Sequence, residues 1–337
     1  MKRSTPHIFV VALGLLATGA AIGWLVKPAP KSSTASNSCL RLSGYTFIKP
    51  LLTCDTTPAD SSEKLLTVQA AVEKTIAVAK KDGSITTASV YLRDLVNRQE
   101  MSINGSETFY PASLKKVPLM MQYYKESETK SGLLAESVVI NDPTDYNADA
   151  VITPKIAPAF GKSYSNAELI NLMISYSDNT SFQVLLRNLG IEKFNQPYLD
   201  LQLFYPDNVV SIDDYMTPYQ FSLFFRTLFN ATYLSKGNSE AALSLLASAD
   251  YKNGLVAGVP ESVRVAHKFG VGVVTQPDGV DQGELHDCGI IYQSDSPYLL
   301  CVMTKSKSLD ITKVEETIAE ISRVVYAYAK NDFERKD

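Results

Sequence analysis

Apolar residues recur every three to four positions near both ends of the chain, at 61–81 and 311–329, which predicts two amphipathic helices. Five shorter stretches have the dense apolar composition of strands. They are 85–95, 100–103, 263–273, 284–293 and 297–305. Between the two groups of strands, residues 113–249 have helical patterns separated by polar turns. Terminal helices packed on a sheet, with a helical insertion between its strands, form an α/β (α+β) arrangement of two subdomains.

A charge-free apolar run covers residues 8–26, directly after basic residues near the N-terminus. The run is just long enough to cross a bilayer as a helix. It continues past the small residues of a possible signal-peptide cleavage site to Trp24, which favours an uncleaved anchor over a cleaved signal peptide. We therefore expect a membrane-anchored protein whose large folded domain is extracytoplasmic. Its expected segments are a cytoplasmic N-terminus at 1–7, a transmembrane signal anchor at 8–26, an extracytoplasmic linker at 27–60 and a folded domain at 61–337.

Composition and charge are ordinary for a globular protein. The 337 residues include 32 basic and 36 acidic side chains, for a formal net charge of −4. Nucleic-acid binding would need a strongly basic domain with clustered lysines and arginines, so we expect no nucleic-acid partner. The membrane is the expected partner of the N-terminal helix.

Four cysteines in an outward-facing protein favour disulfides. Cys39 and Cys54 could close a small loop before the domain. A hairpin of the strands 284–293 and 297–305 would bring Cys288 nearly opposite Cys301, which allows either a cross-strand bridge or two buried free thiols.

Candidate chemistry begins with Ser113 and Lys116, three residues apart at an expected helix start. Residues with this spacing share a helical face, so the amine can reach the hydroxyl and assist its attack on an acyl group. Taken alone, the pair also fits a capping serine followed by a solvated lysine. Two further polar groups follow along the chain, Ser177-Asp178-Asn179 after a helical stretch and Lys268-Phe269-Gly270 within a strand.

The order of these groups resembles the Ser-x-x-Lys, Ser-Asp-Asn and Lys-Thr-Gly set of penicillin-recognising serine hydrolases, and in particular class A β-lactamases. Four blocks carry the resemblance: ASLKKVPLM at 112–120, ISYSDNTS at 174–181, VRVAHKFG at 263–270 and LHDCGIIY at 285–292. The similarity extends from about residue 63 to residue 328. It implies a five-stranded antiparallel sheet flanked by helices, beside an all-helical subdomain, with the site in the cleft between them.

The resemblance also implies roles for individual residues. Ser113 would be the nucleophile, Lys116 its base, and Ser177 the group that passes a proton to the leaving nitrogen. Lys116 can act as a base only if burial or a neighbouring cation, expected to be Lys268, lowers its pKa. Substrate would be bound by Asn179, Lys268, Gly270 and Val271, the last with Ser113 through backbone N–H groups that form the oxyanion hole. The implied substrate is a small β-lactam or a D-alanyl peptide, and no cofactor or metal is expected.

Two departures from the family pattern stand out. Phe269 replaces the threonine whose hydroxyl helps to bind the substrate carboxylate in the family, and the lost hydrogen bond should weaken binding by about 1.5–3 kcal/mol. The family's loop glutamate, which activates the hydrolytic water, is missing, because no glutamate lies between Glu192 and Glu240. Asp200 is the substitute nearest by position, although a surface or capping aspartate is the more ordinary interpretation.

These departures leave three functions open. The leading one is a β-lactamase-like hydrolase that opens a β-lactam amide through a Ser113 acyl-enzyme. A DD-peptidase or slow penicillin-binding enzyme would fit the missing glutamate, and an inactive wall-peptide or protein-binding domain would fit Phe269. A Ser-His-Asp hydrolase built on His286 and Asp287 is disfavoured, because adjacent strand residues point to opposite faces.

Overall fold

The computed structural model describes residues 39–54, 63–205, 213–275, 279–294 and 296–332. The expected cytoplasmic segment and anchor at 1–26 lie outside these residues. Within the described ranges, no helix combines the length and the apolar character that crossing a bilayer requires.

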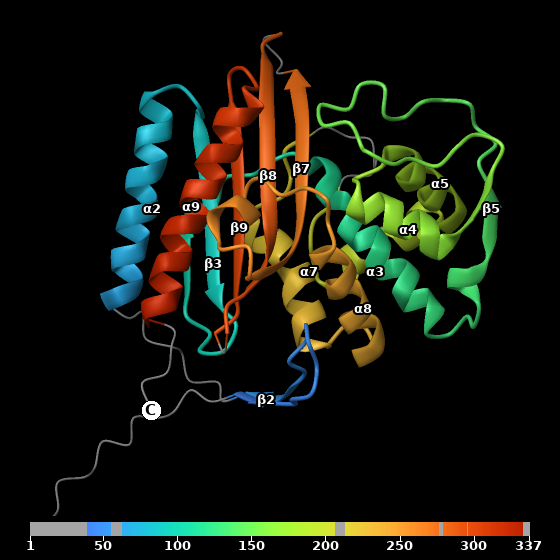
Figure 1. Ribbon diagram of the computed structural model, residues 1–337, viewed down its shortest axis with the longest axis horizontal. Coiled ribbons are helices and arrows are strands. Elements are labelled where there is room, and N and C mark those ends of the chain that lie inside the picture. The colour runs from blue at the N-terminus through green and yellow to red at the C-terminus, as the bar shows by residue number, and fades with distance from the viewer. Residues whose placement is uncertain (1–38, 55–62, 206–212, 276–278, 295, 333–337) are drawn as a thin grey trace, which may run out of the picture. The chain divides into compact units, whose positions relative to one another are not determined.

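A five-stranded antiparallel sheet forms the centre of the domain, in the order β4-β3-β9-β8-β7 (Figure 1). Its strands are β3 (Thr87–Asp94), β4 (Glu100–Ile103), β7 (Arg264–Thr275), β8 (Asp281–Tyr292) and β9 (Tyr298–Ser306). All five lie where the apolar stretches predict strands, so the predicted sheet is confirmed. Since β7 is an edge strand, one side of its backbone is left for other partners.

The terminal helices α2 (Glu63–Lys81) and α9 (Ile311–Asp332) lie side by side over one face of the sheet (Figure 1). Their apolar faces, including Val72 and Ile321, form one core with strand residues such as Val90 and Leu285. The alternate strand residues, such as Tyr91 and Ile290, belong to a second core under the other face. Both faces of the central strands are therefore buried, which explains why their sequences are almost continuously apolar.

A helical subdomain packs against that second face and extends beyond β7. Its helices are α3 (Lys116–Ser127), α4 (Asn166–Ser175), α5 (Asn179–Leu189), α6 (Ile191–Asp200), α7 (Pro218–Asn230) and α8 (Lys236–Ala247). Aromatic side chains supply much of its core, with Tyr198 against Phe224 and Phe221 against Phe225. The predicted two-subdomain α/β arrangement is confirmed.

The region 113–249 is less uniformly helical than its pattern predicts. Two short strands, β5 (Ser137–Val139) and β6 (Ser163–Ser165), pair with each other, and the chain between them is largely irregular. Ser165 then starts α4 with a capping box that uses Glu168. This irregular segment becomes one wall of the cleft described below.

The expected linker also differs from expectation in its described part. Strands β1 (Cys39–Arg41) and β2 (Leu51–Cys54) form a hairpin packed on the domain rather than a free spacer. The carboxylate of Glu240 accepts hydrogen bonds from three successive backbone N–H groups at 46–48. Ile48 is buried in the core of the helical subdomain. Residues 39–54 are thus part of the folded unit.

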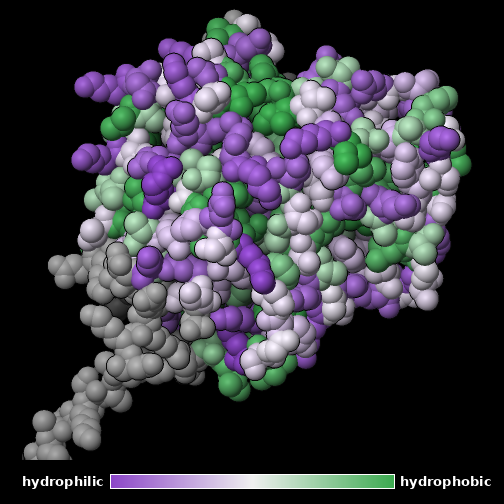
Figure 2. Space-filling view, in the orientation of Figure 1, coloured by the Kyte–Doolittle hydropathy of each residue, from purple (hydrophilic) through white to green (hydrophobic). Residues whose placement is uncertain are grey.

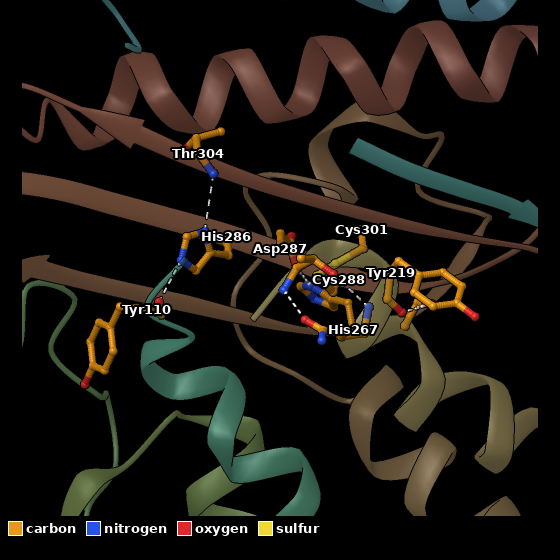
Figure 3. The surroundings of a disulfide bond; sticks show 11 residues. Tyr110, Tyr219, His267, His286, Asp287, Cys288, Cys301 and Thr304 are labelled. Atoms are coloured by element: carbon orange, nitrogen blue, oxygen red, sulfur yellow. Dashed lines mark hydrogen bonds and ion pairs between the residues drawn. A yellow bond between two sulfur atoms is a disulfide. The ribbon is translucent and has the colours of Figure 1, made fainter. Parts of the chain in front are cut away.

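Both cysteine pairs are disulfides. Cys39 joins Cys54 across the β1–β2 hairpin, as expected. Cys288 joins Cys301, directly opposite it in the β8–β9 ladder (Figure 3), which decides between the two states that the sequence left open. The second bridge is fully buried at the middle of the sheet.

Candidate active site

The predicted nucleophile lies in a tight turn rather than at the first turn of an α-helix. Ser113 belongs to the 3₁₀ turn η1 (Ala112–Lys115), which runs directly into α3. Ala112 has a left-handed backbone, with φ 47°. Strand β7 packs closely on this turn, because a Cβ added at Gly270 would lie 2.7 Å from the carbonyl oxygen of Pro111. Only glycine fits there, which gives Gly270 a positional role beside Ser113.

The Lys116 amine lies 3.0 Å from the Ser113 hydroxyl. It is also 2.7 Å from the amide oxygen of Asn179 and 3.2 Å from the Ser177 hydroxyl, and it donates to the Ser177 carbonyl. The amide and carbonyl oxygens can only accept, so they take two N–H groups of the amine. The two hydroxyls can donate. The arrangement therefore suits a neutral amine whose lone pair faces the Ser113 proton.

Burial favours the same neutral form. The Lys116 side chain is 2% exposed, and desolvation lowers its pKa from 10.5 to about 7. The negative charge of Asp178 opposes this shift, and the positive charge of Lys115 adds to it. The expected neighbouring cation, Lys268, is not the main cause; burial is. A lysine with a pKa near 7 can act as a general base at neutral pH.

Ser177 lies in a strained turn between α4 and α5. Its backbone is left-handed, with φ 58°, a conformation that is uncommon for residues other than glycine. Asp178 is the N-cap of α5 and accepts from the Ser181 N–H and from the Asn147 side chain. Asp178 therefore serves the turn, as expected. The turn points Ser177 and Asn179 at Lys116.

Lys268 approaches the same serine from β7. Its amine donates to the Ser177 hydroxyl over 2.8 Å and to the Phe269 carbonyl over 2.9 Å. The Ser177 oxygen thus accepts from Lys268, which leaves its own proton available for donation. Burial lowers the pKa of Lys268, and the positive charge of Lys116 lowers it further. The three separated sequence groups are therefore brought together around one hydroxyl.

A cleft of about 440 Å³ opens over this cluster. Ser113, Lys116, Ser177, Asn179 and Val271 line it. Val271 lies on edge strand β7, whose outer side faces the cleft, as an oxyanion donor would require. Gly270 lies at the back, against the nucleophile turn, and Lys268 is not among the described residues that line the cleft.

The rims of the cleft are unequal in polarity. Val273 of β7 lines it and is about half exposed. Hydrophobic surface gathers toward the β7–β8 end of the molecule (Figure 2). The opposite wall comes from the irregular segment between β5 and β6, with Tyr146, Asp149 and Ile152. An apolar rim over a polar floor suits a small acyl compound.

Lys115 and Tyr110 also line the cleft, and neither is evident from the motifs. The Lys115 amine lies 4.7 Å from the centroid of the Tyr110 ring and 3.4 Å from its hydroxyl. Burial lowers the pKa of Lys115 to about 8. The signal in the sequence is the doubled lysine after Ser113, but periodicity alone gives no reason to place the first of the two in the cleft.

No carboxylate takes the position expected for the missing glutamate among the described residues. Asp200 ends α6 and accepts from Gln196 and Tyr233, away from the cleft. Asp214 binds Lys305. Asp149 is the acidic side chain among the described residues that line the cleft. The proposed substitution of the glutamate by Asp200 is therefore not supported by its contacts.

The rejected Ser-His-Asp arrangement is absent from the described site. His286 contacts the Tyr110 carbonyl and the Thr304 N–H, whereas Asp287 pairs with His267 over 2.8 Å (Figure 3). The two adjacent strand residues thus have separate partners, as their alternation predicts. The described residues also contain no group of three or more side chains suited to hold a metal ion.

Solved structures show which class this architecture defines. The fold is that of penicillin-binding proteins and class A β-lactamases. The structure of PBP-A matches with a TM-score of 0.64 at 20% identity, covering 79% of this chain and 97% of that one. A β-lactamase from Chitinophaga pinensis matches with a TM-score of 0.65 at 21% identity, covering 78% and 99%.

Sequence comparison then identifies the family. The chain belongs to the β-lactamase enzyme family, whose model matches residues 69–329. It is 24% identical over 261 residues to a β-lactamase of Proteus vulgaris, covering 73% of this chain and 92% of that protein. A stretch of 120 residues is 31% identical to a β-lactamase of Citrobacter koseri, covering 35% of this chain and 38% of that protein.

Proposed function

We propose that this protein is a serine hydrolase that opens a β-lactam amide through an acyl-enzyme on Ser113. One observation carries the proposal: the Lys116 amine lies 3.0 Å from the Ser113 hydroxyl, and burial lowers its pKa to about 7. A neutral amine beside a serine is the arrangement that activates a hydroxyl for acyl transfer. Membership of the β-lactamase family supports the substrate class.

The first half of the reaction follows from these contacts. Lys116 takes the proton of Ser113 as the serine oxygen bonds to the acyl carbon. Backbone N–H groups of Ser113 and Val271 stabilise the negative charge on the acyl oxygen. As the C–N bond breaks, Ser177 gives its proton to the leaving nitrogen and regains one from Lys116, which is 3.2 Å away. The proton taken from Ser113 thus replaces the one that Ser177 gives to the leaving nitrogen, so the protons balance, and Asn179 holds the substrate's acylamino carbonyl.

The second half of the reaction, deacylation, distinguishes a β-lactamase from a slow penicillin-binding enzyme or DD-peptidase. The acyl-enzyme must be attacked by water, and the described cleft lacks a glutamate to activate it. A persistent acyl-enzyme would make the protein a slow penicillin-binding enzyme or a DD-peptidase acting on D-alanyl peptides. The similarity to PBP-A gives this alternative a structural precedent. An inactive peptide-binding or protein-binding domain remains the third function.

We also propose that the protein is held at a membrane by residues 8–26, with its folded domain outside the cytoplasm. The apolar run supports the anchor, and two disulfides suit an oxidising compartment. Fractionation of cells that produce the full chain tests the proposal. Recovery of the full-length chain in the soluble cytoplasmic fraction would contradict it.

A fluorescent penicillin, incubated with the protein and followed over time, tests the enzymatic function. We expect a label on Ser113 that is found by peptide mass spectrometry and is absent from Ser113→Ala. Rapid loss of the label with release of opened product supports a β-lactamase. A stable adduct supports the penicillin-binding alternative, and the absence of both a Ser113 label and opened product at high penicillin concentrations would contradict both enzymatic functions.

A further inference from the structure

Lys268 has no hydrogen-bond donor left for a substrate. A lysine ammonium has three N–H donors. Two of them bind the Ser177 hydroxyl and the Phe269 carbonyl, and the third side of the amine faces the Phe269 ring, whose centroid is 4.1 Å away. The side chain is 1% exposed. The residue expected to bind the substrate carboxylate is therefore covered by its own neighbour.

The Phe269 ring is held in this covering position. The Tyr251 ring stacks on it, with centroids 4.1 Å apart and planes 26° apart. The Lys268 amine must lie on the opposite face, because the stacked tyrosine fills the first one. Phe269 itself is 5% exposed. Its ring lies between the cleft and an adjoining pocket of about 290 Å³, since it lines both.

The Phe269 ring, held between Tyr251 and the Lys268 amine, replaces the groups that would bind an anion beside the scissile bond. In place of a hydroxyl and an accessible ammonium, the cleft presents an aromatic ring. A carboxylate placed there would lose hydration without gaining a partner, which is costly, whereas a neutral ester or amide loses little. The two lysines that line the cleft are engaged elsewhere, Lys116 with the serines and Lys115 over Tyr110.

We propose that this site prefers β-lactams or related acyl compounds that carry no free carboxylate next to the scissile bond, and that Phe269 sets this preference. The inference rests on the proposed acylation of Ser113. It changes the expected substrate from an anionic compound to a neutral one at that position.

A matched pair of substrates tests the inference, with one penicillin used as its free acid and as its methyl ester. The rate of Ser113 acylation per unit of substrate concentration is measured for each by intact-protein mass spectrometry. We expect the ester to react faster than the acid. In Phe269→Thr the preference should move toward the acid by roughly ten- to a hundredfold, the range that one hydrogen bond to a charged group provides.

Phe182→Thr is the matched control. This phenylalanine also lines the cleft, but its ring packs on Phe194 instead of Lys268. We expect it to leave the ratio of acid to ester rates as in the wild type. A wild-type preference for the acid would overturn the inference while leaving the proposed function intact, and this result does not depend on any variant folding. Absence of both a Ser113 adduct and an opened product with either compound would refute both.

Discussion

Replacement of Lys116 by methionine should abolish most of the acylation and, at the same time, stabilise the protein at acidic pH. Methionine keeps the length and apolar stem of lysine but has no base and no charge. Loss of a general base lowers rates by about 10²–10⁴-fold. The gain in stability follows from the cost of burying an amine that is 2% exposed.

The size of that cost follows from the pKa, which falls from 10.5 to about 7 in the fold. Since a tenfold change in proton affinity corresponds to about 1.4 kcal/mol, burial of the charged Lys116 amine lowers the free energy of unfolding by on the order of 5 kcal/mol. Below pH 7 the lysine is charged in both the folded and the unfolded chain, so the full cost applies. Between about pH 7 and 10.5 only the unfolded chain holds the extra proton, and stability rises with pH.

Methionine also leaves the buried Ser177 carbonyl without a donor, at a cost of about 1–3 kcal/mol. The Asn179 oxygen loses the same donor, but Asn179 is half-buried and lines the cleft, so water can replace it. We therefore expect Lys116→Met to be more stable than the wild type by about 2–4 kcal/mol at pH 6. Near pH 10 the sign should reverse, because the buried charge has gone and the unpaired Ser177 carbonyl remains.

Urea unfolding at several pH values measures this difference, and mass spectrometry of Ser113 measures acylation. Lys74→Met, at an exposed lysine of α2, is the control and should follow the wild-type pH dependence. A Lys116→Met protein that is less stable than the wild type at pH 6 would refute the argument. So would a difference between the two proteins that does not change with pH.

The contact of β7 with the nucleophile turn predicts that Gly270→Ala slows Ser113 acylation at least tenfold and costs about 1–3 kcal/mol of stability. Its Cβ would lie 2.7 Å from the Pro111 oxygen, whereas Gly237→Ala, in helix α8 with nothing within 4 Å, should leave acylation unchanged and raise stability by up to about 1 kcal/mol in the same assays. Conversion of both Cys288 and Cys301 to alanine should lower the melting temperature more than the same change in the β1–β2 disulfide. The two loops are of similar length, so equal losses would show that burial of the inner bridge adds nothing.

The sheet was predictable because each strand is a dense apolar stretch in the sequence. The site was predictable for the residues that belong to the three ordered motifs. Ser113, Lys116, Ser177 and Lys268 meet as the motif order implies. The oxidation state of Cys288 was not predictable, because the hairpin places it opposite Cys301 whether or not the two sulfurs are bonded.

Other features depend on contacts between distant segments. Nothing local indicates that Tyr251 stacks on Phe269, or that Glu240 holds the backbone at 46–48. The 3₁₀ turn at Ser113 was also missed, because helical periodicity does not separate a 3₁₀ start from an α-helical one. The substitution of Phe269 was visible in the sequence, but its effect on Lys268 required the geometry.

The energetic cost of the site argues against an inactive binding domain. Two residues other than glycine, Ala112 and Ser177, hold left-handed backbones beside the reactive groups, at about 1–3 kcal/mol each. Two lysines are buried there with lowered pKa values. Such strain and buried charge lower stability, and a surface that only binds a peptide needs neither. A base poised near neutral pH beside a serine hydroxyl needs both, because burial is what lowers the pKa of Lys116 and the strained turn is what presents Ser177 to it.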